Sequence, residues 1–148
     1  MKEIHTQIDI KASAERAWQT LIDFNNYSQW NPFIRQINGA PKIGTKLEIH
    51  LHTASGKRRT YRPTITKLEP YRELRWYGKS FIPGMFNGEH IFTIETLGVN
   101  HILFLHREIF TGLGVALSGD RLDRDLYQSF EKMNNAFKEK LEKAVINN

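Results

Sequence analysis

The last quarter of the chain carries the pattern that most restricts its fold. Between positions 120 and 145, apolar residues recur at steps of four, four, three, four, four and three. They are Leu122, Leu126, Phe130, Met133, Phe137, Leu141 and Ala144. This spacing places one apolar stripe on an α-helix whose other faces are charged. A rod of roughly 39 Å with one apolar side needs a large apolar partner, which the preceding residues must supply.

A series of short strands is predicted to form that partner. Alternating apolar and polar residues indicate strands at 4–10, 34–39, 47–52, 58–68, 74–77, 87–96 and 102–110, with a bulge or sheet edge at Pro63. Ser13 is placed to cap a helix that ends near Asp23, and a second short helix or ordered turn is expected within residues 24–33. Strands joined by short turns pair antiparallel. We therefore expect an α+β fold: a curved antiparallel sheet of about seven strands around the long C-terminal helix.

Length and composition predict a single soluble globular domain over residues 1–148. The chain is 40% hydrophobic and 25% charged, with a formal net charge of +5. It contains no cysteine and starts without a signal-like segment, so we expect a cytoplasmic location. No apolar run approaches the ~20 residues of a membrane span.

Seven segments together resemble the START-like superfamily (SRPBCC, birch-pollen-allergen-like), nearest its polyketide cyclase/dehydrase-type members. They are residues 8–10, 14–18, 21–24, 30–33, 74–76, 88–92 and 108–112. The resemblance implies a helix-grip fold, with a cavity for lipids, hormones, aromatic polyketides or other apolar molecules. It does not imply one activity, because the superfamily includes carriers, cyclases, hydrolase-like enzymes and co-chaperones.

His90, His106 and Glu108 form the most distinctive polar group. If the turn pairs Thr96 with Ile102, His90 lies opposite Glu108 on one inward face, at a separation that allows contact. Three roles remain open for this group: a structural hydrogen-bonded patch, an anchor for the polar end of a ligand, or an acid/base pair. No cofactor is expected. A metal site is not favoured here, nor at Glu48, His50 and His52, which share a solvated strand face.

Inward-facing aromatic residues exceed what one sheet and one helix need for packing, which predicts a ligand cavity. The loop around residues 81–86 is apolar and is expected to cover its mouth, while the start of the long helix is expected to roof it. The predicted ligand-binding residues are Trp30, Phe33, Tyr61, Trp76, Phe81, Met85, Phe86, Phe92, Phe104, Phe110, Leu117, Leu122 and Leu126.

These features favour a binding or carrier domain for a small hydrophobic or aromatic molecule. The alternative is a cyclase or dehydratase-type enzyme in which His90, His106 and Glu108 act as acid/base groups. A third hypothesis is an interaction module that uses the basic hairpin Lys57, Arg58 and Arg59 for weak contact with anionic surfaces. A solvated hairpin tip explains the same charges, and the sequence does not favour a nucleic-acid partner.

Overall fold

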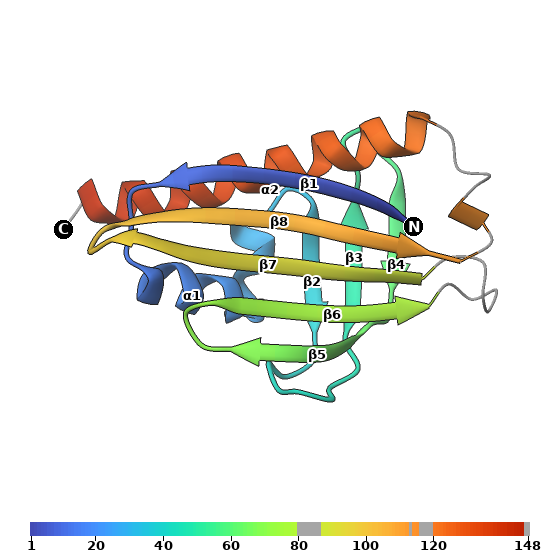
Figure 1. Cartoon of the computed structure of the whole chain (residues 1–148), viewed down its shortest axis with the longest axis horizontal. Helices are drawn as coiled ribbons and strands as arrows, with labels where there is room; N and C mark the ends of the chain where they lie inside the picture. The colour runs from blue at the N-terminus through green and yellow to red at the C-terminus, as the bar shows by residue number, and fades with distance from the viewer. Residues whose placement is uncertain (80–86, 113, 116–119, 147–148) are drawn as a thin grey trace.

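The structure is a computed structural model that describes residues 1–79, 87–112, 114–115 and 120–146. Side chains of residues 120–122 and 144–146 lie outside the description. In chain order the elements are β1 (Lys2–Ile10), α1 (Ala14–Ile22), the 3₁₀ helix η1 (Phe24–Gln29), β2 (Ile34–Asn38), β3 (Glu48–His52), β4 (Arg58–Tyr61), β5 (Thr64–Glu69), β6 (Glu73–Lys79), β7 (Asn87–Gly98), β8 (His101–Thr111) and α2 (Asp120–Ile146). The expected α+β architecture is confirmed (Figure 1).

The strands form two antiparallel sheets. The larger has the order β1-β8-β7-β6-β5 and the smaller the order β2-β3-β4. In Figure 1 the strands of the smaller sheet cross those of the larger at a steep angle. The predicted register of β7 and β8 is confirmed, because Thr96 pairs with Ile102 and His90 with Glu108.

The predicted single strand over residues 58–68 is wrong in one respect. The chain leaves the smaller sheet after Tyr61 and joins the larger sheet at Thr64, so one expected strand is two. Pro63, which lacks an N–H for a sheet ladder, lies at this break. The sheets stay linked here, since the Leu47 N–H donates to the Pro63 carbonyl at 2.7 Å and the Ile65 N–H to the Thr45 carbonyl at 3.0 Å.

Helix α2 has the predicted boundaries to within one residue and buries the predicted stripe. Phe130, Met133, Phe137 and Leu141 are all buried in the core. Figure 1 shows α2 running alongside β1, with its C-terminal end near α1. Its long axis therefore spans both the packed core and the site described below.

The N-terminal half of α2 is tied to the turn between β3 and β4. The Ser55 backbone N–H and hydroxyl both donate to the Asp125 carboxylate, at 2.7 and 2.8 Å. The Ala54 N–H donates to the Ser129 hydroxyl at 2.8 Å, and that hydroxyl donates to the Asp125 carbonyl. These bonds attach the smaller sheet to the helix. None of the helices that the structure describes is long and apolar enough to cross a bilayer.

Candidate functional site

A cavity of about 660 Å³ lies between the two sheets, beside the N-terminal half of α2. Its apolar wall comes from both sheets and from the helix, and consists of Phe33, Ile34, Ile49, Leu51, Trp76, Phe110 and Leu126. The volume and the mainly apolar wall are typical of a small-molecule site. Lys79 and Asn87, which border residues 80–86, also line the cavity.

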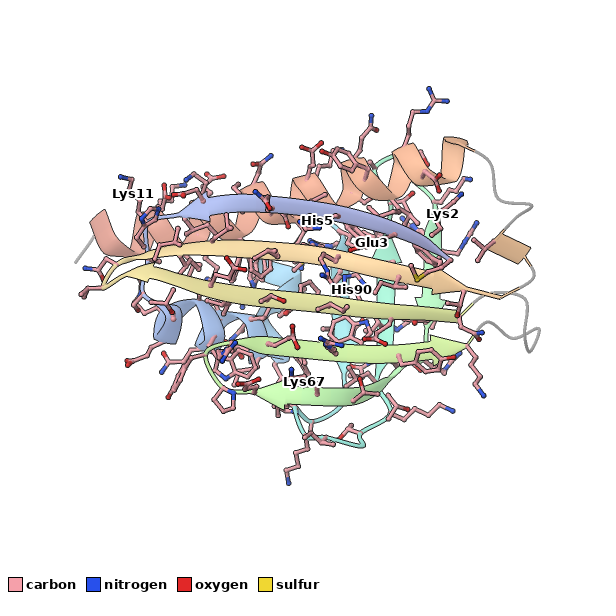
Figure 2. All side chains as sticks on the ribbon, viewed as in Figure 1. Lys2, Glu3, His5, Lys11, Lys67 and His90 are labelled. Atoms are coloured by element: carbon pink, nitrogen blue, oxygen red, sulfur yellow. The ribbon has the colours of Figure 1, made fainter. Side chains whose placement is uncertain are left out.

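The structure brings part of the predicted ligand-binding set together on this wall. Phe33, Tyr61, Trp76, Phe110 and Leu126 line the cavity, as do the predicted acid/base residues His90 and Glu108. Figure 2 labels His90, which lies in the N-terminal part of β7. Residues from strands and a helix far apart in sequence therefore meet at one site.

Other predicted residues lie in the packed core instead of on the cavity wall. Phe92 and Phe104 are fully buried, and Phe104 packs on Phe137 with ring centroids 4.7 Å apart. Trp30 also packs on Phe137, at 5.3 Å. Trp30, Phe92 and Phe104 therefore pack in the core and are not among the residues that line the cavity. Phe81, Met85, Phe86 and Leu117 lie outside the described residues, as does the side chain of Leu122.

Tyr61 extends from β4 to the larger sheet at a pair of glycines. Gly78 and Gly88 lie opposite each other in β6 and β7. A Cβ atom at Gly78 would lie 2.5 Å from the phenol oxygen of Tyr61, and one at Gly88 would lie 3.0 Å from Oε1 of Glu108. The Tyr61 hydroxyl donates to the Gly88 carbonyl at 3.0 Å. The absence of side chains at both positions thus makes the space that Tyr61 and Glu108 occupy.

Burial raises the pKa of the Tyr61 phenol, and the nearby charge of Glu108 raises it further. Tyr61 is therefore a protonated hydrogen-bond donor across the ordinary pH range. It serves as a neutral polar group on the cavity wall.

A buried hydrogen-bonded chain connects the cavity to helix α2. Nε2 of His90 lies 2.7 Å from Nε2 of His106, and Nδ1 of His106 lies 2.9 Å from Oδ1 of Asn134. The Asn134 amide nitrogen donates to the Thr6 hydroxyl at 2.8 Å, and that hydroxyl donates to the backbone carbonyl of His106 at 2.9 Å. At the cavity end, Nδ1 of His90 lies 3.5 Å from Oε2 of Glu108.

The direction of each bond in this chain follows from its last member. The carbonyl of His106 can only accept, so Thr6 must donate to it and accept from the Asn134 amide nitrogen. The Asn134 oxygen then faces His106, whose Nδ1 must carry the proton. Burial holds the pKa of His106 well below its usual value, with His90 as the second cause, so His106 is neutral and its Nε2 is an acceptor. His90 therefore donates from Nε2 and presents Nδ1 to Glu108.

This geometry assigns different positions to the three predicted acid/base residues. His90 and Glu108 line the cavity, whereas His106 is fully buried behind them and does not. Both ring nitrogens of His106 are occupied by Asn134 and His90. His106 can orient His90, but it does not reach a molecule in the cavity. Among the described residues, no group of three or more potential ligands is arranged to hold a metal ion.

Sequence reasoning named Arg59 in the basic hairpin but did not place any cationic side chain at the cavity, whose wall includes Lys46, Arg59, Arg62 and Lys79. Arg59 lies two residues before Tyr61 on the same strand, and alternate strand residues share a face. That spacing was a usable signal for Arg59. The sequence reasoning also missed Asn134 and Thr6, although Asn134 lies next to Met133 on the apolar side of α2.

Comparisons with known proteins agree with this architecture. A family model described as polyketide cyclase / dehydrase and lipid transport matches residues 1–142 of the chain. A search of curated proteins found no match.

Solved structures of the same fold come from several organisms. A START superfamily protein from Mycobacterium smegmatis is 17% identical with a TM-score of 0.77, over 96% of this chain and 98% of that chain. The Zhui aromatase/cyclase from a Streptomyces species is 15% identical with a TM-score of 0.78, over 97% and 95%. The Aha1 dimer from Colwellia psychrerythraea is 23% identical with a TM-score of 0.71, over 96% and 97%. These identities show a shared fold.

Proposed function

We propose that this chain, which belongs to the polyketide cyclase / dehydrase and lipid transport family, binds a small hydrophobic or aromatic molecule in the cavity between its sheets and α2. The observation that carries the proposal is the cavity itself, whose wall is mostly apolar and aromatic. A space of about 660 Å³ beside Trp76, Phe33 and Leu126 offers dispersion contacts to an apolar guest.

The polar groups on the wall complement this apolar surface. The Tyr61 hydroxyl and the pair His90–Glu108 are fixed by hydrogen bonds or by buried neighbours, so they present defined donors and acceptors. A few convergent polar groups on an apolar wall orient a ligand and select among similar ones.

Filling the cavity tests the proposal. Leu126→Trp should occupy part of the cavity and weaken binding of neutral apolar compounds at least tenfold, measured by titration with Nile red and a panel of lipids and aromatic compounds. Tyr127→Trp is the matched control, because Tyr127 is the next residue of α2 and is 45% exposed. Native mass spectrometry after incubation with a cell extract identifies natural ligands. A wild-type protein that binds none of these compounds would overturn the proposal.

A second candidate function is acid/base catalysis of the cyclase or dehydratase type, with an enolisable polyketide-like substrate. The specific observation in its favour is that His90 and Glu108 face the same cavity, 3.5 Å apart, while the buried chain sets the tautomer of His90. In a dehydration, the Glu108 carboxylate would take a proton from the carbon between two carbonyls, and the pair would return one to the hydroxyl that leaves as water.

Assay of a synthetic poly-β-ketone with wild type and Glu108→Gln separates the two candidates. Catalysis predicts loss of turnover in Glu108→Gln with binding retained. Equal turnover by the two proteins, or a product distribution identical to that without protein, would refute catalysis. Ligand binding would then be the remaining candidate function. His106→Phe should change the pH profile of any turnover, because His106 positions His90 and does not contact the substrate.

A further inference from the structure

We propose that the molecule bound in the cavity carries an anionic group, a carboxylate or a phosphate, which lies at the mouth against Arg59, Lys46 and Lys79. This inference rests on the proposed binding function and specifies the class of ligand. The apolar body of the ligand would occupy the cavity between Trp76 and Leu126. Its charged end would remain at the rim.

The charge balance of the wall is the first observation. Four cationic side chains line the cavity, Lys46, Arg59, Arg62 and Lys79, against one carboxylate, that of Glu108. Glu108 lies beside His90, deep in the cavity, and is 8% exposed. Its charge is therefore separated from the exposed cations at the rim, where the positive potential is uncompensated.

Three of the four cations on the cavity wall form no ion pair with a described residue. Arg62 lies 3.3 Å from Glu48, whereas none of Lys46, Arg59 and Lys79 forms an ion pair with any residue the structure describes. On the outer side of β5 and β6, by contrast, Lys67 lies 2.7 Å from Glu73 and Arg75 lies 2.9 Å from Glu89. Lys46, Arg59 and Lys79 can therefore bind an external anion without first breaking an ion pair to a described residue.

Arg59 has the position expected for direct contact with the ligand. Arg59 is two residues before Tyr61 on β4 and is paired across the sheet with Leu51. Tyr61 and Leu51 both line the cavity. Among the described residues, the Arg59 guanidinium donates one hydrogen bond, to the carbonyl of the adjacent Arg58 at 3.1 Å. The remaining N–H groups suit bidentate binding of a carboxylate or phosphate. Arg58, by contrast, is absent from the cavity wall, although it carries the same charge on the same strand.

Matched ligands with one alkyl chain test the inference. Binding of decanoate, decyl phosphate and decan-1-ol is measured by isothermal titration for wild type, Arg59→Gln and Arg58→Gln, at low and high salt. We expect wild type to bind at least one of the two anions about tenfold more tightly than the alcohol, and the tighter anion identifies the head group. Arg59→Gln should remove most of that preference and leave the affinity for decan-1-ol unchanged. Arg58→Gln should leave all three affinities unchanged.

The outcomes separate this inference from the function on which it rests. High salt should weaken the binding of the two anions and leave the binding of the alcohol unaffected, because the rim is exposed to solvent and its charge is screened. Equal affinity of wild type for the alcohol and both anions at low salt would overturn the anionic class while supporting an apolar site. An equal loss of affinity for all three ligands in Arg59→Gln would also overturn the anionic class, since it would show that Arg59 acts through packing and not through its charge. Failure of every compound to bind, including the neutral panel, would overturn the binding function itself.

Discussion

Replacing Asn134 with Leu tests the hydrogen-bonded chain that links α2 to the cavity. The side chain of Asn134 accepts from Nδ1 of His106 at 2.9 Å and donates to Thr6 at 2.8 Å, and all three residues are buried. Leucine has a similar size but neither polar group. The change therefore leaves the Nδ1–H of His106 without a partner and removes one bond accepted by Thr6.

The expected cost follows from these two losses. An orphaned buried donor costs about 1–3 kcal/mol, and the lost bond at Thr6 adds about 1 kcal/mol. Burial of additional apolar atoms by leucine offsets roughly 1–2 kcal/mol of this. We therefore expect a net destabilisation of about 1.5 kcal/mol, equivalent to a fall in Tm of roughly 3–6 °C for a chain of this length.

Urea unfolding followed by tryptophan fluorescence measures this cost. Asn135→Leu is the matched control, because Asn135 is the next residue of α2 and is exposed; its free energy of unfolding should stay within about 0.5 kcal/mol of wild type. Nitrogen-15 NMR of the imidazoles supplies a second measurement. In wild type, His106 should carry its proton on Nδ1 and His90 should carry one on Nε2. A wild-type His106 protonated on Nε2, or equal stabilities of the two leucine variants, would refute the reasoning.

The remaining predictions concern packing, the glycine pair and pH. Phe137→Ala should cost about 3–5 kcal/mol, because Phe137 is fully buried; Leu126→Ala should cost less and change ligand affinity, as measured by thermal unfolding with and without ligand. Gly78→Ala should displace the Tyr61 ring and match Tyr61→Ala in ligand affinity, since its Cβ would overlap the phenol. Burial acts to raise the pKa of Asp125, but hydrogen bonds from Ser55 and Thr53 and the nearby charge of Lys57 together hold that pKa below its usual value. The stability that Asp125 contributes should therefore be complete above about pH 4 and decline as the pH falls further; in urea unfolding the difference between wild type and Asp125→Asn should shrink accordingly.

Much of the fold was predictable because its signals are periodic and local. The apolar steps from Leu126 to Leu141 define a helix face, and the burial of Phe130 and Phe137 confirms it. The turn after β7 set the register in which His90 opposes Glu108. A shift of one residue would have buried Arg107, so the hydrophobic pattern left one acceptable pairing.

The site was less predictable because it depends on contacts between distant elements. Phe92 and Phe104 have the same inward pattern as Trp76, yet only Trp76 lines the cavity. What separates them is the path of α2, whose Phe137 packs on Phe104. No periodicity in a strand reports how closely a helix approaches it. Asn134 did carry a signal, since a polar residue on the apolar side of a helix must find a buried partner.

The two halves of α2 explain why packing and cavity coexist on one helix. The C-terminal half contacts the larger sheet directly, with Phe137 against Phe104 and the Asn134 amide bonded to Thr6 of β1. The N-terminal half is bonded to the β3–β4 turn through Asp125 and Ser129, which attach it to the smaller sheet. The helix therefore lies along β1 of the larger sheet, to which Asp123 is also joined by an ion pair with Lys2, and its N-terminal half is attached to the smaller sheet as well. The cavity lies between the two sheets beside this N-terminal half, where Leu126 contributes to its wall.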